Sequence, residues 1–491
     1  PALLAVLAGG LTVLGFAPFG LFPVPVLTLA ILFGLWEREP SPRQRFWLGW
    51  LFGLGLFGTG VSWIAISIDQ FGGVGPWVAV PLTLLFVAFL ALYPGLAGGL
   101  SVILAPRGLL AAGLPGLWLG VEWWRGWFLS GFPWLSLGYS QIDGPLAGFV
   151  PLLGVHGAGL GVALSAGWLV LAARPVGTSR RLALGGLLLL WLGGYGLTGQ
   201  TWGQRGEGET LRVALVQGNI PQQIKWQPEY LKASIDRYWG LTRAHWDEAD
   251  LIVWPETALP DLLERLDTPL LAPLETLLAE QQKYLVLGIP ARHPDGRYFN
   301  SILALGGERS RYDKRHLVPF GEFTPLAGLL KPLMAYFDIP MSDFSAGSSE
   351  PPLLRVGRHW VGASVCYEDA FGEETLAALP AAAFLINLSN DAWFGHSLAP
   401  HQHLEMARMR ALESDRWLLR ATNTGISALI DPQGRIRARS GDFETSVTIA
   451  PIEPRQGRTP YGYWGNGGVL GLALVLVVFY GSRRHSGTTG A

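Results

Sequence analysis

Long apolar segments recur along this chain, and they constrain its fold more than any other sequence feature. A membrane-spanning helix needs roughly 20 apolar residues. Eight segments approach or exceed that length, and they lie near residues 2–17, 20–36, 46–66, 76–105, 108–125, 147–173, 182–199 and 466–482. Only 15% of the 491 residues are charged, and the mean hydropathy is +0.30. We therefore predict a polytopic α-helical membrane protein with about eight spans, the first a retained span and not a signal peptide.

The basic residues between these segments predict how the chain crosses the membrane. Lys and Arg concentrate in the short cytoplasmic loops of membrane proteins. The loops after the second, fourth, sixth and eighth segments carry Arg38, Arg43, Arg45, Arg107, Arg174, Arg180, Arg181, Arg483 and Arg484. With eight spans these loops all lie on one side. The chain between the seventh and eighth spans then lies outside, which in a bacterium is the periplasmic face of the inner membrane.

Residues 210–455 have the pattern of an ordinary globular domain. Short β-branched and apolar runs predict strands at 211–217, 251–254, 284–289, 300–305, 309–312, 361–365, 382–388, 417–421 and 426–430. Helical spacing predicts helices at 228–246, 269–282, 368–379 and 400–414. Strands that alternate with helices indicate an α/β layered domain. The predicted organisation is a helical membrane region at 1–203, this domain at 210–455, and a C-terminal span at 466–482.

Charge and cysteine content exclude several classes of function. The formal net charge is −1, so the chain lacks the basic excess that favours nucleic-acid binding. Its single cysteine permits neither an intrachain disulfide nor a cysteine-based metal site. His396, His401 and His403 are close in sequence but have no companion carboxylate pattern. We therefore predict no metal site.

Two charged residues lie inside a predicted span. Glu122 and Arg125 are three residues apart, so on a helix they could pair. Alternatively, both lie at the membrane interface beside Trp123, Trp124 and Trp127, where aromatic residues form a belt. We favour the interface.

The single cysteine, Cys366, directly follows the predicted strand 361–365 and precedes a run with helical spacing. Backbone N–H groups at such a junction favour a thiolate and can hold an oxyanion. A free cysteine is more often a small core residue, and this stretch alone favours the core interpretation. The residues at the other strand ends decide between the two.

Two other strand ends carry ionisable side chains that suit a nucleophilic thiol. Glu256 follows the strand 251–254, and Lys314 follows the strand 309–312. Because active residues of layered α/β domains gather at strand ends, we expect the two side chains to meet Cys366. A buried carboxylate can take the thiol proton. The ammonium can stabilise a tetrahedral oxyanion together with the backbone N–H of Tyr367.

The residues around these three positions resemble the signatures of the nitrilase, or carbon–nitrogen hydrolase, superfamily. They read WPET at 254–257, YDKRHLVPFGE at 312–322 and VCYE at 365–368. Such a domain between seven upstream spans and one downstream span is similar to the apolipoprotein N-acyltransferase family, a membrane-embedded branch of that superfamily. The resemblance covers essentially the whole chain. It implies that the globular domain is an α-β-β-α sandwich.

The resemblance also implies roles for individual residues and requires no cofactor. Glu256 would be the general base, Lys314 the oxyanion-stabilising residue and Cys366 the nucleophile. Glu322 and Glu368 would be accessory carboxylates that hold Lys314 and tune Glu256, although a solvated loop charge is the alternative for Glu322. Further candidates line the substrate pocket, with plain core roles as the alternative for the aromatic ones; they are Trp226, Asn300, Tyr367, Asn390 and Trp393.

The implied reaction is a two-step acyl exchange through a thioester on Cys366. The acyl donor would be a membrane phospholipid, and the acceptor would be the α-amine of the diacylglyceryl cysteine that begins an apolipoprotein. This is the last step of bacterial lipoprotein maturation, and we expect a monomer to perform it. Two alternatives remain. A membrane-anchored amidase would use the same triad with water as acceptor, and a transporter or scaffold would carry an inactive domain.

A further apolar run, residues 323–344, separates Glu322 from the Cys366 strand. It is far more apolar than the domain around it, and Pro325, Pro332 and Pro340 prevent one long helix. We predict that this run overhangs the active site, dips into the outer leaflet and admits acyl chains. The alternative is a loop packed on the surface of its own domain.

Overall fold

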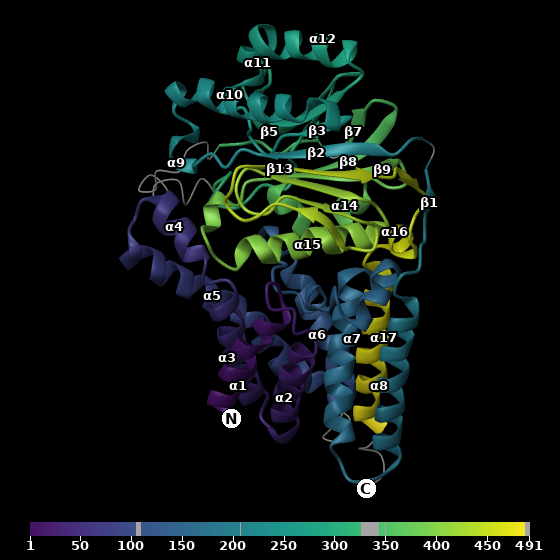
Figure 1. Ribbon diagram of the computed structural model, residues 1–491. Helices are drawn as coiled ribbons and strands as arrows, with labels where there is room; N and C mark the ends of the chain where they lie inside the picture. The colour runs from purple at the N-terminus through teal and green to yellow at the C-terminus, as the bar shows by residue number, and fades with distance from the viewer. Residues whose placement is uncertain (105–109, 207, 326–342, 349, 487–491) are drawn as a thin grey trace. The chain divides into compact units, whose positions relative to one another are not determined.

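The computed structural model of the chain describes residues 1–104, 110–206, 208–325, 343–348 and 350–486. Contacts divide the chain into two compact units. The helical unit comprises Pro1–Ala65, Pro76–Gln200 and the chain from Tyr463 onward. The α/β unit comprises Ile66–Gly75 and Thr201–Gly462. Figure 1 labels the helices and strands of both units.

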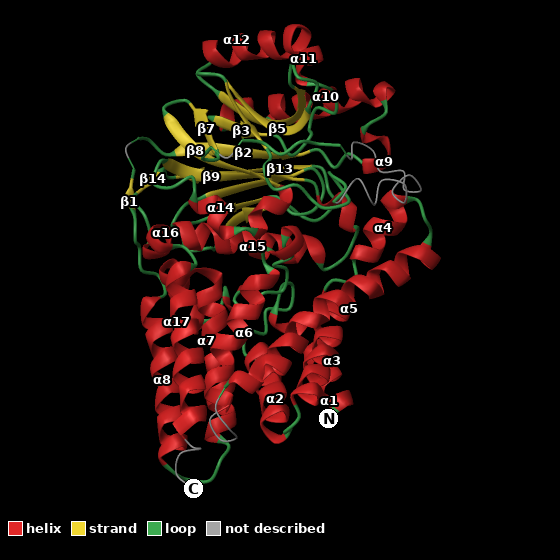
Figure 2. Cartoon of the chain, turned by 180° about the vertical axis from the view of Figure 1, so that it is seen from behind, coloured by secondary structure: helices red, strands yellow, loops and turns green. Residues whose placement is uncertain are grey.

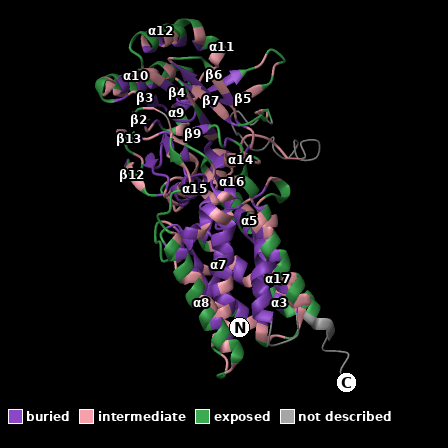
Figure 3. Ribbon diagram, turned by 90° about the vertical axis from the view of Figure 1, so that its right-hand side faces the viewer, coloured by how far each residue is buried: buried purple, intermediate pink, exposed green. Residues whose placement is uncertain are grey.

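The helical unit contains a helix within each of the predicted apolar segments. These helices are α1 (Ala2–Thr12), α2 (Val24–Arg38), α3 (Pro42–Gly60), α5 (Pro76–Leu100), α6 (Leu110–Arg125), α7 (Val150–Ala172), α8 (Thr178–Leu197) and α17 (Gly467–Ser486). Glycine lets helices pack closely, and a Cβ at Gly9 of α1 would lie 1.9 Å from the carbonyl oxygen of Phe52 in α3. Helices α8 and α17 have stretches of exposed residues (Figure 3), and the exposed apolar residues include Leu189 and Val475. Exposed apolar faces of this kind are typical of helices that meet lipid.

The lengths of these helices differ from the prediction. Pro76–Ile103 and Pro145–Ala172 are long and apolar enough to cross a membrane, and α3 with α4 (Ile64–Gly72), bent by 56° at their junction, would make a third span. The apolar helices Ala2–Gly15 and Gly467–Ser482 are shorter. At about 1.5 Å per residue they cover only part of a hydrocarbon core of roughly 30 Å. Among the described helices, about eight spans are therefore not confirmed.

Polar contacts join helix ends that flank the predicted basic loops of the helical unit. Glu37, near the end of α2, pairs with Arg174 after α7 (Oε2–Nη2 3.0 Å) and accepts from the Ala111 backbone N–H at the start of α6 (2.7 Å). Arg45, near the start of α3, donates to the Ser101 hydroxyl directly after α5 (3.0 Å). The described helix ends that flank these loops, Glu37, Arg45, Ser101, Ala111 and Arg174 among them, thus contact one another in two groups within this unit.

Glu122 and Arg125 are buried and lie close enough to pair, the alternative that the prediction did not favour, while a position at the membrane interface stays a prediction. Arg125 Nη2 lies 3.9 Å from Glu122 Oε1. Glu122 Oε1 also accepts from the Leu137 backbone N–H at 2.9 Å, and Arg125 Nη1 donates to the Trp134 carbonyl at 2.6 Å. The physical reason is that the chain after α6 presents backbone groups inside an apolar unit, where they need partners.

The α/β unit contains two six-stranded sheets. The order in the first is β13 (Ser446–Ile452), β2 (Leu211–Gln217), β3 (Leu251–Val253), β4 (Tyr284–Arg292), β5 (Tyr298–Leu305) and β6 (Ser310–Asp313). The order in the second is β12 (Ile436–Arg439), β11 (Ala428–Ile430), β10 (Leu418–Thr422), β9 (Ala382–Ser389), β8 (His359–Val365) and β7 (Leu353–Val356). Strands β2, β3 and β4 are parallel, as are β8, β9 and β10. Within each sheet, their C-terminal ends therefore share one edge.

Helices cover both outer faces of the paired sheets. Apolar side chains that include Leu215 and Val253 of the first sheet and Val361 and Phe384 of the second form the core between them. Helices α10 (Pro228–Ala244) and α12 (Ala272–Glu280) pack on the first sheet, and α15 (Ala399–Ser414) packs on the second. Figures 1 and 2 show the resulting layers, which form the expected α-β-β-α sandwich.

One predicted helix within this unit is wrong, and three strands of the two sheets, β7, β12 and β13, were not predicted. The predicted helix 368–379 is broken into a 3₁₀ turn, η8 (Cys366–Ala370), and the short helix α14 (Gly372–Leu376). The Glu368 carboxylate accepts from the Val365 backbone N–H at 2.7 Å, and this contact tightens the first turn. Strand β13 was not predicted, because Thr448 and Pro451 interrupt its apolar pattern. It lies at a sheet edge, where proline is tolerated.

Candidate active site

Glu256, Lys314 and Cys366 lie at three strand ends of the α/β unit. Glu256 is in the loop after β3, Lys314 directly follows β6, and Cys366 directly follows β8. Their exposed fractions are 9%, 1% and 8% respectively, so all three are buried. The Cys366 thiol is within electrostatic reach of both Glu256 and Lys314. Such interactions are stronger in a buried site than in water, because the effective dielectric constant of the site is lower.

A chain of polar contacts joins Glu256 to Lys314. Asn300 Nδ2, from β5, donates to Glu256 Oε1 at 2.8 Å and to Glu322 Oε1 at 3.1 Å. Lys314 Nζ donates to Glu322 Oε1 at 2.9 Å and lies 2.8 Å from Oε2. Asn300 therefore lies between two carboxylates, and Glu322 holds the ammonium in place.

Burial and these neighbours shift the pKa of Glu256 and the pKa of Lys314. Burial raises the pKa of Glu256, an effect that Lys314 offsets in part and Glu322 reinforces. Burial would lower the pKa of Lys314, but Glu322 and Glu256 raise it above its ordinary value. Lys314 therefore stays an ammonium. Glu256 binds a proton more readily than a solvent-exposed carboxylate does, a property that a general base would need.

The backbone and the thiol of Cys366 are both unusual. The backbone φ is +51°, in the left-handed region, and a non-glycine residue persists there only when its surroundings hold it. Burial raises the pKa of the Cys366 thiol to about 12, with Glu256 adding to the rise and Lys314 opposing it. The resting group is therefore a thiol, and a nucleophilic role for it requires a base that takes its proton.

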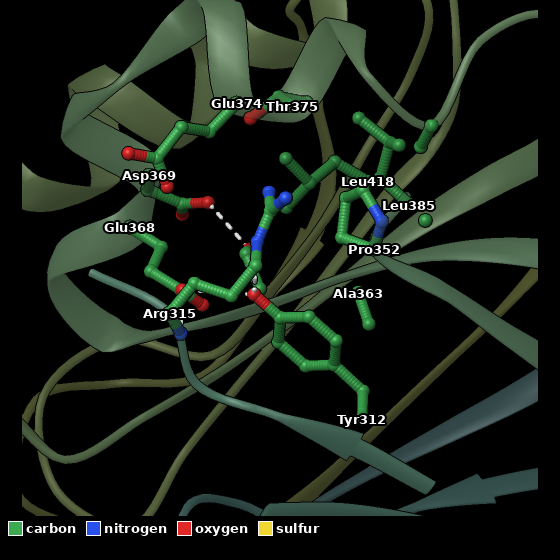
Figure 4. Close-up of a pocket in the computed structure, with 13 residues that line it drawn as sticks. Tyr312, Arg315, Pro352, Ala363, Glu368, Asp369, Glu374, Thr375, Leu385 and Leu418 are labelled. Atoms are coloured by element: carbon green, nitrogen blue, oxygen red, sulfur yellow. Dashed lines mark hydrogen bonds between the residues drawn. The ribbon is translucent and has the colours of Figure 1, made fainter. Parts of the chain in front are cut away.

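Glu368 joins the loop after β6 to the end of β8. Its Oε1 accepts from the Tyr312 hydroxyl and from the Arg315 backbone N–H, both at 2.8 Å, and its Oε2 accepts from the Val365 backbone N–H at 2.7 Å. Figure 4 shows Tyr312, Arg315 and Glu368 around one cavity. Glu368 therefore ties the backbone of the loop after β6 to the backbone at the end of β8. Glu322, in contrast, contacts the ammonium of Lys314.

A second set of buried polar groups lies behind the nucleophile. His403 Nε2, from α15, donates to the Cys366 carbonyl at 3.1 Å, and Asn387 Nδ2 approaches the same oxygen at 3.4 Å. His403 Nδ1 lies 2.9 Å from Asp391 Oδ1, and Asp391 Oδ2 accepts from Arg420 Nη2 at 3.0 Å. We call His403, Asp391, Arg420 and Asn387 the supporting cluster. Sequence reasoning gave these residues no role with the nucleophile, because they come from separate elements and carry no local motif.

Lys225 is a second buried lysine at the site that sequence reasoning did not identify. It ends α9 (Gln222–Lys225), the turn that follows β2, and its Nζ donates to the Glu256 backbone carbonyl at 3.0 Å. The rule that active residues lie after strand ends applies equally to β2. Applying that rule to β2 would have directed attention to the segment that contains Lys225.

The remaining pocket candidates lie in different surroundings. Trp226 directly follows Lys225 and is partly buried. Tyr367 is buried, and its ring lies 5.1 Å from that of Phe371. Asn390 is also buried and donates to Gln222 Oε1 of α9 at 2.7 Å.

Trp393 packs against α4, the helix that precedes Pro76 by only a few residues. The ring centroids of Trp393 and Phe71 are 4.6 Å apart. The Trp393 carbonyl accepts from the Ser67 hydroxyl at 2.6 Å. This contact joins residues that are 326 positions apart in the sequence, and both belong to the α/β unit.

The three clustered histidines separate in the structure. His401 Nε2 lies 3.3 Å from Asp442 Oδ2, and the His396 ring lies 4.0 Å from that of Phe443. His403 belongs to the supporting cluster. Among the described residues, no group of three or more His, Cys, Asp or Glu side chains could hold a metal ion.

The predicted lid, residues 323–344, falls largely outside the described residues, which omit 326–342. At its two ends, the Phe323 carbonyl accepts from the Phe320 backbone N–H at 2.8 Å, and the Phe344 backbone N–H donates to the Glu322 carbonyl at 3.0 Å. The lid itself stays a prediction.

Known proteins resemble this chain over nearly its whole length. A family model described as the apolipoprotein N-acyltransferase N-terminal domain matches residues 8–168, and one described as carbon-nitrogen hydrolase matches residues 212–461. An apolipoprotein N-acyltransferase of Methylococcus capsulatus is 43% identical over 99% of this chain and 96% of its own length. The corresponding protein of Pseudomonas aeruginosa is 42% identical over 97% of this chain and 94% of its own length. Among solved structures, a nitrilase-superfamily amidase of Nesterenkonia AN1 covers 51% of this chain and 93% of its own, with 20% identity and a TM-score of 0.38. By its sequence matches, this chain belongs to the apolipoprotein N-acyltransferase family.

Proposed function

We propose that this protein transfers a fatty acyl chain from a membrane phospholipid to the α-amine of an apolipoprotein's N-terminal diacylglyceryl cysteine. The observation that carries the proposal is Cys366. It is the only cysteine of the chain, and it is buried beside a carboxylate and an ammonium. A thiol of this kind can store an acyl group as a thioester between two substrates.

In the first half of the reaction, the Cys366 sulfur attacks the ester carbonyl of the phospholipid. Glu256 accepts the thiol proton as the carbon–sulfur bond forms. Lys314, held by Glu322 at 2.8 Å, stabilises the oxyanion of the tetrahedral intermediate. The carbon–oxygen bond then breaks. Glu256 returns the proton to the departing lysophospholipid oxygen, which leaves an acyl-thioester on Cys366.

In the second half, the lipoprotein amine attacks the thioester. Glu256 accepts a proton from the amine nitrogen as the amide bond forms, and Lys314 again stabilises the oxyanion. The carbon–sulfur bond breaks, and the sulfur recovers the proton from Glu256. Ester and thioester are close in free energy, whereas the amide lies well below the thioester. The second half therefore draws the first forward.

We also propose that the chain crosses the bacterial inner membrane with about eight spans and acts as a monomer. Polar contacts join the helix ends that flank three of the basic loops, which supports a common cytoplasmic side under the positive-inside rule. An odd number of predicted spans precedes the α/β unit, so that unit faces the periplasm. There, Trp226, Tyr367, Asn390 and Trp393 are the proposed substrate contacts.

Product analysis with the full-length protein in detergent tests the reaction. The donor is a phospholipid with labelled acyl chains, and the acceptor is a peptide that begins with S-diacylglyceryl cysteine. We expect a labelled acyl-amide. The same peptide with an acetylated α-amine should give none, because it lacks the nucleophile. Released fatty acid in place of amide would identify a hydrolase and contradict the proposal.

The donor alone tests the intermediate. Without acceptor, we expect one labelled acyl group per protein, bound to Cys366 and released by neutral hydroxylamine, which cleaves thioesters. Label that resists hydroxylamine, or that lies on another residue, would exclude Cys366 as the acyl carrier.

A further inference from the structure

Lys225 is a charged residue that the three-residue mechanism leaves unused. Its side chain is 2% exposed, although lysines are almost never fully buried unless they are paired. Its Nζ donates to the backbone carbonyl of Glu256 at 3.0 Å. An ammonium from a fourth strand end therefore fixes the residue whose carboxylate takes the thiol proton.

We propose that Lys225 is a second lysine of the active site, a positioning residue that holds Glu256 and balances the negative charge that Glu256 and Cys366 carry during the reaction. This inference deepens the proposed function. It rests on it only in taking Cys366 as the nucleophile and Glu256 as its base.

The charges of the site support this role. While Cys366 is a thiol, the two negative charges of Glu256 and Glu322 equal the two positive charges of Lys314 and Lys225. Both oxygens of Glu322 lie within 2.9 Å of Lys314, so much of that ammonium's charge is already matched. The side-chain partner of Glu256 is the Asn300 amide, which brings no charge. Without Lys225, a thiolate would form in a buried site that already has a negative excess, and burial makes such an excess costly.

The two lysines also differ in how readily they lose a proton. Burial lowers the pKa of Lys225 to about 8, although Glu256 and Cys366 raise it in part. The carboxylates raise the pKa of Lys314. The ionisable groups that interact with Lys225 are Glu256 and Cys366. Cys366 also interacts electrostatically with Lys314 and Asp391. As pH rises through about 8, Lys225 becomes neutral while Lys314 stays charged, so Cys366 should gain less reactivity with pH than an isolated thiol does.

Alkylation of Cys366 by iodoacetamide tests the inference in the full-length protein. Because the chain has one cysteine, the reaction reports that thiol directly and needs no lipid substrate. Lys225→Met removes the charge and the hydrogen bond, Lys225→Gln keeps a donor without the charge, and Lys225→Arg keeps both. At neutral pH we expect alkylation to slow about tenfold in the Met and Gln variants, with its pH dependence moved upward by about one unit. The Arg variant should recover most of the rate.

A matched control separates this site from a general charge effect. Lys232 lies on α10, is 84% exposed and pairs with Asp236. Lys232→Met deletes the same charge and should leave the alkylation rate unchanged.

Three outcomes would overturn the inference. An unchanged alkylation rate in Lys225→Gln would show that the charge of Lys225 does not affect the thiol and that only its hydrogen bond matters. Slow alkylation in all three Lys225 variants with a lowered unfolding temperature would give it a purely structural role. An equal effect of Lys232→Met would make the charge effect non-specific. If Lys225→Met does not fold, the comparison of the Gln and Arg variants decides alone. Failure of the labelled-lipid assay in the unaltered protein would instead contradict the proposed function.

Discussion

Cys366 lies between two sets of buried charge that differ in how firmly they hold their protons. On the reacting side, the cations are lysines, and burial raises the pKa of Glu256. In the supporting cluster, the cation that pairs with Asp391 is an arginine, Arg420, and guanidinium groups in general hold their proton more firmly than ammonium groups do. Burial would raise the pKa of Asp391 there, but Arg420 and His403 lower it. Buried groups that can exchange protons face the thiol, whereas on the other side Arg420 and Asp391 hold His403, which donates to the Cys366 carbonyl.

The difference teaches how one residue can be both reactive and rigid. The left-handed backbone of Cys366 needs constant support, and the buried Asp391–Arg420 pair contributes to it by holding His403 against the Cys366 carbonyl. The thiol needs the opposite kind of neighbour, one that changes protonation in every cycle. The predictions below test whether damage to the two sides has different consequences, in activity on one side and in stability on the other.

The largest effect should come from the nucleophile itself. Cys366→Ser should reduce acyl transfer by about a thousandfold or more, because an alkoxide is far harder to form at neutral pH than a thiolate. The unfolding temperature should stay close to that of the unaltered protein, because the two side chains have nearly the same size. Undiminished acyl-amide formation by this variant would show that another residue carries the acyl group.

Next in size is the removal of the fixed charge. Arg420→Met should lower the free energy of unfolding by about 3–5 kcal/mol, because it leaves buried carboxylates without their cation. Denaturant unfolding measures this loss, and adding Asp391→Asn should restore part of it. The control is Arg297→Met, which removes an exposed arginine paired with Asp295 and should cost at most about 1 kcal/mol. Unchanged stability with lost transfer would move Arg420 to the reacting side and break the comparison.

Lys314→Ala should lower activity with little loss of stability, which is the converse of the outcome for Arg420→Met. Thioester formation should slow by roughly a hundredfold, about 3 kcal/mol of transition-state stabilisation. Phospholipid binding should change little, since the ammonium acts on charge that appears only as the bond forms. Single-turnover labelling measures the rate, and equilibrium binding of the lipid serves as the control. Equal losses in binding and rate would indicate a general role in holding substrate.

The smallest effect should come from His403→Gln. A glutamine amide can still donate to the Cys366 carbonyl, so we expect a loss of only about 1 kcal/mol in stability and a small loss of rate. His403→Leu removes the donor and should cost more in both. If the two variants behaved alike, the hydrogen bond to the nucleophile's carbonyl would have no measurable role.

The layers of the α/β unit were predictable, because each rests on a local pattern. Predicted strands 211–217 and 361–365 coincide with or lie within β2 and β8, since short apolar runs between turns have few other solutions. The break of the predicted helix 368–379 was not predictable in this way. It depends on the Glu368 side chain, which contacts Val365 and the loop after β6. A helical pattern alone does not reveal such a competitor.

The site shows the same division. The strand-end rule placed Glu256 and Cys366 at buried junctions, and it would have reached Lys225 had it been applied to β2. Asp391 and Arg420 escape any such rule. Arg420 lies inside β10, and its partner follows β9. Only the register of two neighbouring strands brings them together.

Helix α4 has a consequence for how this protein is made. Residues Ile66–Gly75 belong to the α/β unit, yet the contact of Ser67 with Trp393 spans 326 residues. At ordinary rates of synthesis, the ribosome needs on the order of tens of seconds to cover that distance. Throughout that time α4 has been synthesised but its binding surface has not. The contact between α4 and Trp393 can therefore form only late in synthesis, and a fragment excised at Thr201–Gly462 would lack residues of the α/β unit that are made long before its first strand.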